Sequence, residues 1–327
     1  MQARHPPATP RNRFRTMVRA FRPHRAGLSR SALRRTAALV WLLPLLGLAG
    51  CKNSVLDPVG PIGTGDATIL MDSVAIMLCI VVPVFIATAG FAFWFRAGNT
   101  RARYRPNFIH SGTIELVVWA IPLLVILLLG GVTWIGSHEL DPAKPLPPIT
   151  KPLRVQVVSL DWKWLFIYPD LKLASVNELT IPAGTPIDFT LTSASVMNAF
   201  FIPRLGSMIY TMNGMTVRLN LQADTAGTYL GESSHYSGDG FSGMRFDVHA
   251  LPAEQFDTWV EATRQKGPVL DEAAYKALER QSLNVTPFTY RNADPTLFAR
   301  IVAQLIPPAE GPPADTPHRD VSPKSIP

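Results

Sequence analysis

Residues 231–244 read Gly-Glu-Ser-Ser-His-Tyr-Ser-Gly-Asp-Gly-Phe-Ser-Gly-Met. Glycines and short hydroxyl residues dominate this stretch, a composition that is typical of turns and predicts a tight loop between two β-strands. Positions 233, 237, 241 and 244 have the spacing of a metal-binding loop. Three of them, however, carry serine or phenylalanine, which are not metal ligands of any strength. The rest of the chain has to explain this mismatch.

The region around the loop is predicted to be rich in short strands. Apolar and β-branched runs, broken by Gly, Pro and Asn, predict strands at Leu153–Leu160, Trp162–Tyr168, Asn177–Ile181, Pro186–Ser193 and Thr216–Leu221. Strands at this density indicate an all-β sandwich or barrel. Within 162–168 the aromatic residues alternate, which predicts a single core-facing row: Trp162, Trp164, Phe166 and Tyr168.

Two long apolar runs precede the β-region. Ile69–Phe95 and Ile114–Ile135 are each long enough to cross about 30 Å of hydrocarbon as a helix. The short connection at 96–105 carries four arginines, and the positive-inside rule places it in the cytoplasm. Cys51 and everything after about residue 138 would then face the periplasm.

The N-terminus has the features of an export signal. Residues 1–35 are basic, and the apolar run 36–48 is too short to span a bilayer. It ends in Leu-Ala-Gly-Cys51, which resembles the bacterial lipoprotein lipobox. That resemblance implies cleavage before Cys51 and lipidation of its thiol, palmitate included, whereas an ordinary signal cleaved near Gly50 is the alternative. Either Met1 or Met17 could be the true start.

Composition agrees with a membrane protein and argues against nucleic-acid binding. Hydrophobic residues make up 47% of the 327 residues and charged residues only 17%, a balance that favours membrane segments. The net charge of +7 comes largely from ten arginines between Arg4 and Arg35, within the signal. No nucleic-acid-binding signature accompanies them. With only two cysteines, one of them in an apolar run, a disulfide framework is not expected.

The start of the second apolar run carries a more specific pattern. Glu115, Trp119 and Pro122 form Glu-x-x-x-Trp-x-x-Pro, which resembles the second-helix signature of subunit II of haem-copper oxidases. Four residues apart on a helix, Glu115 and Trp119 share one face and are candidates for docking on a partner subunit. The alternative is an interfacial charge without a partner.

The β-region extends this resemblance to the opening loop. Residues 198–215 resemble a family segment that begins with a copper-ligating His, and 231–244 resemble the loop that supplies Cys, Cys, His and Met to the dinuclear CuA centre. Carried over position by position, the lost ligands are Asn198, Ser233, Ser237 and Phe241, and Met244 alone keeps its ligand type. Thiolates and imidazoles are what such a soft site requires, so we expect no metal here. His235 falls where the family uses a backbone carbonyl, and a solvated or partner-contacting loop is favoured over a zinc site or general base.

A copper-less loop in this context resembles subunit II of the cytochrome o-type ubiquinol oxidases, over roughly residues 65–290. The resemblance implies a two-helix transmembrane hairpin plus an all-β cupredoxin-like Greek-key sandwich, with a short α-helical C-terminal extension. It also implies a non-redox subunit of a complex that oxidises ubiquinol, reduces dioxygen to water and pumps protons. This chain would bind no cofactor and hold no catalytic residue; haems and copper B would lie in subunit I. Expected partners are subunits I, III and IV, membrane lipid, and ubiquinol through subunit I.

These expectations divide the chain into a signal peptide (1–50), a lipidated hairpin (51–138), a periplasmic domain (139–250), a helical extension (251–306) and a disordered tail (307–327). Helices are predicted at Pro252–Lys266, Glu272–Gln281 and Pro295–Leu305. The whole would be anchored in the bacterial inner membrane. Two alternatives stay open: subunit II of a cytochrome c oxidase with a degenerate copper site, and a membrane-tethered lipoprotein that is a binding module outside any oxidase.

Overall fold

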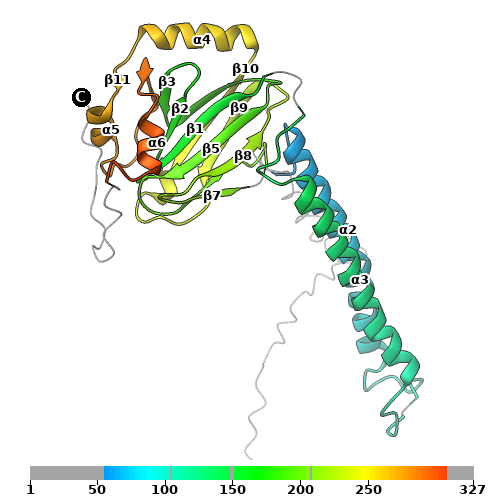
Figure 1. Cartoon of the computed structure of the whole chain (residues 1–327). Helices are drawn as coiled ribbons and strands as arrows, with labels where there is room; N and C mark the ends of the chain where they lie inside the picture. Colours follow the sequence, from blue (N-terminus) through cyan, green and yellow to red (C-terminus); the bar gives the residue numbers. More distant parts are fainter. Residues whose placement is uncertain (1–54, 104, 148–150, 207, 308–327) are drawn as a thin grey trace, which may run out of the picture. The chain divides into compact units, whose positions relative to one another are not determined.

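The computed structural model of the chain describes residues 55–103, 105–147, 151–206 and 208–307. The predicted signal peptide, Cys51 and nearly all of the predicted tail lie outside these residues. The described part consists of a helical hairpin, a two-sheet β-sandwich and a C-terminal extension (Figure 1).

The hairpin consists of α2 (Pro61–Trp94) and α3 (Gly112–Glu139), each apolar and long enough to span a bilayer. Both helices are longer than the predicted apolar runs. Helix α2 begins eight residues earlier, where Pro61 occupies a first-turn position that needs no backbone donor. Pro83 and Pro122 lie inside the helices, and membrane-spanning helices tolerate proline at such positions.

Backbone hydrogen bonds join the base of the hairpin to loops of the sandwich. Val59 N donates to Arg204 O and Gly63 N donates to Leu205 O, each at 2.9 Å. After the end of α3, at the same base of the hairpin, Pro142 O accepts a bond from Asn220 N at 2.9 Å. These bonds join the start of α2 and the segment after α3 to the β-domain.

The sandwich is formed by a six-stranded sheet of order β12-β3-β2-β1-β5-β8, in which β12 (Phe288–Tyr290) comes from the C-terminal extension, and a five-stranded sheet of order β4-β10-β9-β6-β7. The pairs β1–β5 and β4–β10 are parallel, and the other pairs are antiparallel. The strands are β1 (Leu153–Leu160), β2 (Lys163–Tyr168), β3 (Leu173–Val176), β4 (Glu178–Pro182), β5 (Ile187–Ser193), β6 (Asn198–Phe201), β7 (Ile209–Thr211), β8 (Val217–Leu221), β9 (Gly227–Ser233) and β10 (Arg245–Leu251).

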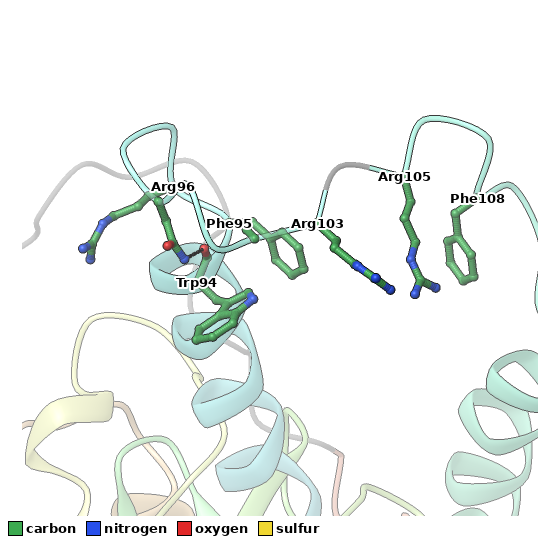
Figure 2. Close-up of a pocket in the computed structure, with 8 residues that line it drawn as sticks. Trp94, Phe95, Arg96, Arg103, Arg105 and Phe108 are labelled. Carbon is green, nitrogen blue, oxygen red and sulfur yellow. Dashed lines mark hydrogen bonds between the residues drawn. The ribbon is translucent and has the colours of Figure 1, made fainter.

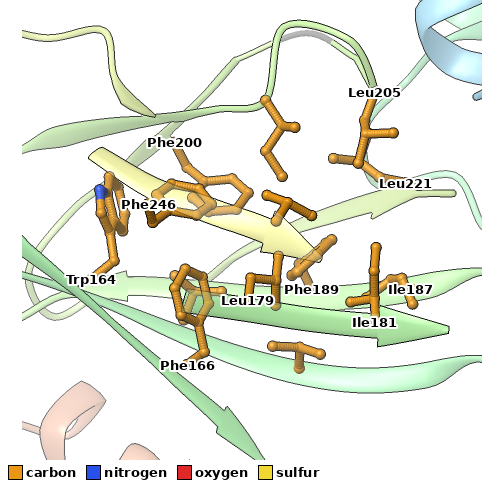
Figure 3. Close-up of a cluster of buried hydrophobic side chains, with 14 of the residues drawn as sticks. Trp164, Phe166, Leu179, Ile181, Ile187, Phe189, Phe200, Leu205, Leu221 and Phe246 are labelled. Atoms are coloured by element: carbon orange, nitrogen blue, oxygen red, sulfur yellow. The ribbon is translucent and has the colours of Figure 1, made fainter. Parts of the chain in front are cut away.

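Aromatic side chains fill the space between the two sheets (Figure 3). The rings of Phe200 and Phe246 stack at 5.3 Å, and Trp164 packs edge-on against Phe200 at the same centroid distance. Phe166 and Tyr168 are also in this core, as predicted. Trp162 is an exception to the predicted row, because it precedes β2 with a left-handed backbone (φ 64°) and packs against the 231–244 loop instead.

The extension covers the outer face of the six-stranded sheet as well as one end of the core. Its elements are α4 (Ala253–Gln265), β11 (Val269–Leu270), α5 (Glu272–Leu278), β12 (Phe288–Tyr290), β13 (Asn292–Ala293) and α6 (Leu297–Val302). Helix α4 contributes Phe256 and Val260 to the inner core. A second apolar cluster lies between the outer face of β1–β3 and helices α5 and α6. The three predicted helices are present, whereas β12, which extends the main sheet, was not predicted.

Candidate functional site

The 231–244 loop connects β9 to β10, two antiparallel neighbours in the five-stranded sheet. A single 3-10 turn at Phe241–Gly243 leads into β10, and Gly238 adopts φ 106°, a conformation that favours glycine. Ser233 N donates to Met244 O at 3.0 Å, which closes the two ends of the loop on each other. The prediction of a tight inter-strand loop is therefore confirmed.

Two of the predicted ligand positions meet in a buried polar contact. Ser233 Oγ lies 3.3 Å from Asn198 Oδ1 and 3.3 Å from His235 O, and its single proton can be donated to only one of them at a time. Asn198 is 1% exposed, and its Nδ2 donates to Val196 O at 3.3 Å. Within this contact the Ser233 hydroxyl is the donor and the Asn198 carboxamide oxygen is the acceptor.

The side chains at the other three predicted ligand positions lie in three different environments. Ser237 is buried, and its Oγ has no hydrogen-bond partner among the described atoms. Met244 is 1% exposed and belongs to the aromatic core. Phe241 is half-buried, with its ring 5.7 Å from that of Tyr236. Met244 and Phe241 thus pack against aromatic side chains, and Ser237 has a buried hydroxyl without a partner among the described atoms.

Trp162 holds the middle of the loop in place. Its indole Nε1 donates to Ser237 O at 3.0 Å. A Cβ built at Gly240 would lie 2.3 Å from ring atoms of Trp162, so only glycine fits under the indole. Sequence reasoning placed Trp162 in the core row and missed this role, because it extended β2 by one residue at its start.

The donor set does not fit a dinuclear copper centre. Two hydroxyls, a carboxamide and a phenyl ring replace the charged thiolates and imidazoles that would bridge and hold copper. The one soft donor, the Met244 thioether, is packed in the core. His235 is half-buried with Tyr210 edge-on at 5.8 Å, and within the described ranges no group of three His, Cys, Asp or Glu side chains gathers around it or elsewhere.

A buried charge cluster is formed by the residues on either side of Trp162 in the sequence, Asp161 and Lys163, together with Glu279, and was not predicted. Lys163 is fully buried, and its Nζ donates to Arg280 O at 2.6 Å and to Ser282 Oγ at 2.7 Å, both in the extension. Burial lowers the pKa of Lys163 to about 8, opposed by the charges of Asp161 and Glu279. Burial likewise raises the pKa of each of these two carboxyl groups. Strand alternation alone would have placed Lys163 in solvent, and only the covering extension changes that.

The helix-face candidates lie in the first two turns of α3. His110 Nδ1 lies 3.1 Å from Glu115 Oε2, and the Glu115 side chain is 55% exposed. Trp119 is 73% exposed. Both side chains are therefore exposed on the surface of α3. Cys51, the lipidation candidate, lies outside the described residues.

Comparison with known proteins gives two family matches. A family described as "Cytochrome C oxidase subunit II, periplasmic domain" matches residues 168–251, and one described as "COX Aromatic Rich Motif" matches residues 264–309. The first begins at the last residue of β2, covers the sandwich from β3 to β10 and includes the 231–244 loop. The second covers α5, α6 and the strands between them.

Similar curated proteins extend the match over most of the chain. "Ubiquinol oxidase subunit 2" of Acetobacter aceti is 48% identical over 274 residues, which cover 83% of this chain and 89% of the relative. "Cytochrome bo(3) ubiquinol oxidase subunit 2" of Pseudomonas aeruginosa is 44% identical over 82% of each chain. "Quinol oxidase subunit 2" of Bacillus cereus is 38% identical over 76% of this chain and 87% of the relative.

Proposed function

The chain belongs to the ubiquinol oxidase subunit 2 family, and on that premise we propose that it is the non-redox structural subunit of a terminal oxidase. The complex would oxidise ubiquinol, reduce dioxygen to water and move protons outward. The haems and copper B that carry out this chemistry would be held by subunit I, which would also bind ubiquinol. Subunits III and IV would complete the assembly.

The observation that carries the non-redox role is the chemistry of the loop. The positions that correspond to the copper-ligating Cys and His residues carry Asn198, Ser233, Ser237 and Phe241, so no thiolate or imidazole is available there. Ser233 Oγ lies 3.3 Å from Asn198 Oδ1, and Met244 is packed in the core. We infer that Asn198, Ser233, Ser237 and Phe241 mark a lost CuA site. A quinol oxidase takes its electrons from within the membrane and has no need for a relay on the water side.

The hairpin and its arginines support a periplasmic placement of the sandwich. With the arginine-rich connection in the cytoplasm, the sandwich and the expected lipid on Cys51 would both be on the periplasmic side of the inner membrane. The exposed apolar surfaces of α2 and α3 need lipid or other helices to cover them. We propose that Glu115 and Trp119 form part of the contact with subunit I.

The proposed role is tested by purifying the intact complex through a tag on this chain. We expect a haem-bearing multi-span subunit to co-purify. We also expect the electron paramagnetic resonance spectrum to lack the signal of a mixed-valence, thiolate-bridged copper pair. Such a signal would contradict the non-redox role. A chain that purifies without haem would instead indicate a lipoprotein that acts outside any oxidase.

A further inference from the structure

The connection between α2 and α3 has a high density of uncompensated positive charge. Residues 95–111 contain four arginines and no acidic residue. Glu115, the nearest carboxylate in sequence, is paired with His110. In the part of the chain that the structure describes, Arg96, Arg101, Arg103 and Arg105 take part in no ion pair. Among the described residues, this group of arginines therefore has no anionic partner.

Two of these arginines face a common pocket. It has a volume of about 650 Å³, and its lining includes Trp94, Phe95 and Phe108 together with Arg103 and Arg105. Figure 2 shows the Arg103 and Arg105 side chains extending in the same direction, between the rings of Phe95 and Phe108. Arg96 takes no part in this pair, because its guanidinium group lies over the Phe93 ring at 4.1 Å.

Hydrogen bonds shape the turn that leads into this pocket. Asn99 Nδ2 donates to Trp94 O at 2.6 Å, and Arg101 N donates to Asn99 Oδ1 at 3.2 Å. After the arginine pair, Phe108 N donates to Arg105 O at 3.2 Å. The backbone on both sides of the arginines is thereby folded into defined turns, which reduces the ordering cost when a ligand binds.

We propose that this pocket, formed by Arg103 and Arg105 between Phe95 and Phe108, binds the phosphate headgroup of an anionic glycerophospholipid. Guanidinium groups donate paired hydrogen bonds to phosphate oxygens, which suits the doubled arginines. The pocket lies at the ends of two apolar helices, where headgroups are found, and aromatic rings are favoured at that depth. Basic pockets between helices on the cytoplasmic side recognise anionic headgroups for these reasons.

The pocket also suits a lipid better than free phosphate. Its walls combine guanidinium groups with the apolar faces of Phe95, Phe108 and Trp94. A small inorganic anion could use only the charged part of this lining. A glycerophospholipid presents a phosphodiester next to a glycerol backbone and acyl chains, so it can use both parts.

The test uses the intact oxidase complex, delipidated in detergent and then supplied with mixed micelles of phosphatidylglycerol. Native mass spectrometry would count retained lipid in the wild type, in Arg103→Gln, in the double variant R103Q/R105Q, and in Arg101→Gln. Arg101 is an exposed arginine of the same connection but does not line the pocket, so its variant controls for loss of charge. Subunit content is measured on every sample.

We expect the wild type and Arg101→Gln to retain phosphatidylglycerol equally, and the double variant to need at least tenfold more lipid for the same occupancy. Arg103→Gln should fall between them, with all subunits still present. Equal retention by all variants, or equal retention of phosphatidylcholine by the wild type, would overturn the proposal. So would displacement of the lipid by millimolar inorganic phosphate. Loss of a protein subunit from the double variant, with lipid retained, would show that the pocket binds a carboxylate of a partner.

Discussion

Lys163 shows how a single side chain links the sandwich to the extension. Its ammonium group is fully buried and is held by Arg280 O and Ser282 Oγ, with Asp161 and Glu279 as nearby counter-charges. A buried charge of this kind costs free energy to desolvate and depends on its partners for compensation. Removing it would leave the Arg280 carbonyl without its donor and the two carboxyl groups without their cation.

We predict that Lys163→Met destabilises the chain at pH 7 by about 2–4 kcal/mol, since one member of a buried charged group is removed. The sign of the pH dependence of the free energy of unfolding follows from the pKa of Lys163. The pKa of Lys163 is about 8 in the folded chain and near its ordinary value of 10.5 when unfolded. Between these values the unfolded chain binds more protons, so this group makes the free energy of unfolding rise with pH.

Thermal unfolding of the detergent-solubilised full chain, followed by circular dichroism from pH 7 to 10, would measure this effect. The wild type should gain stability relative to Lys163→Met as pH increases from 8 toward 10. Melting curves that shift in parallel for the two proteins would show that Lys163 titrates as it does in water.

At the scale of elements, packing against neighbouring side chains explains why the 231–244 loop needs glycine at position 240. Gly240 has φ −86°, which any residue can adopt, so its requirement for glycine comes from space and not from backbone conformation. A Cβ there would be 2.3 Å from ring atoms of Trp162 and from Leu283 Cδ2. The loop is therefore packed between β2 and the extension.

We predict that Gly240→Ala lowers the stability of the chain by about 1–3 kcal/mol, as overpacking of a closely filled site does. Gly243→Ala is the matched control in the same loop. Its Cβ would meet only Asn284 Oδ1, at 2.6 Å, which is the end of a side chain that can rotate away. Melting temperatures of the two variants should differ by several degrees, and equal values would contradict the packing of the loop against Trp162.

The elements also show what the sequence alone could and could not predict. The apolar runs and five of the strands between Leu153 and Leu221 were predicted because each has a local pattern of its own, whereas β3, β6 and β7 in the same region were not. Strand β12 was missed because it joins the sheet through β3, more than a hundred residues earlier in the chain. The burial of Lys163 was missed for the same reason, since the residues that cover it come from the extension.

At the scale of the whole molecule, hydrogen bonds at the base of the hairpin join it to the sandwich. Val59 and Gly63 bond to the 204–205 loop, and Asn220 bonds to Pro142 beyond α3. Gly60 is required at this junction, because a Cβ there would lie 1.9 Å from the Gln222 carbonyl oxygen. This connection suits a subunit in which a membrane hairpin holds a domain that lies outside the bilayer.

Glu115 provides a test of how the hairpin joins that complex. We predict that Glu115→Gln lowers the yield of subunit I that co-purifies with this chain several-fold, because a charged hydrogen-bonding group would be lost at the contact. Glu139→Gln, which removes an exposed carboxylate at the other end of the same helix, should leave the yield unchanged. Normal recovery of subunit I with Glu115→Gln would remove this residue from the interface.

We propose that electrons reach the oxidase without passing through this chain. The most direct measurement is oxygen consumption by the purified complex, supplied in parallel with ubiquinol and with reduced cytochrome c. We predict sustained turnover with ubiquinol and none above background with cytochrome c. Met244→Leu, which removes the remaining soft donor at little change in volume, should leave the ubiquinol rate unchanged. Sustained turnover with cytochrome c that Met244→Leu abolishes would contradict the account.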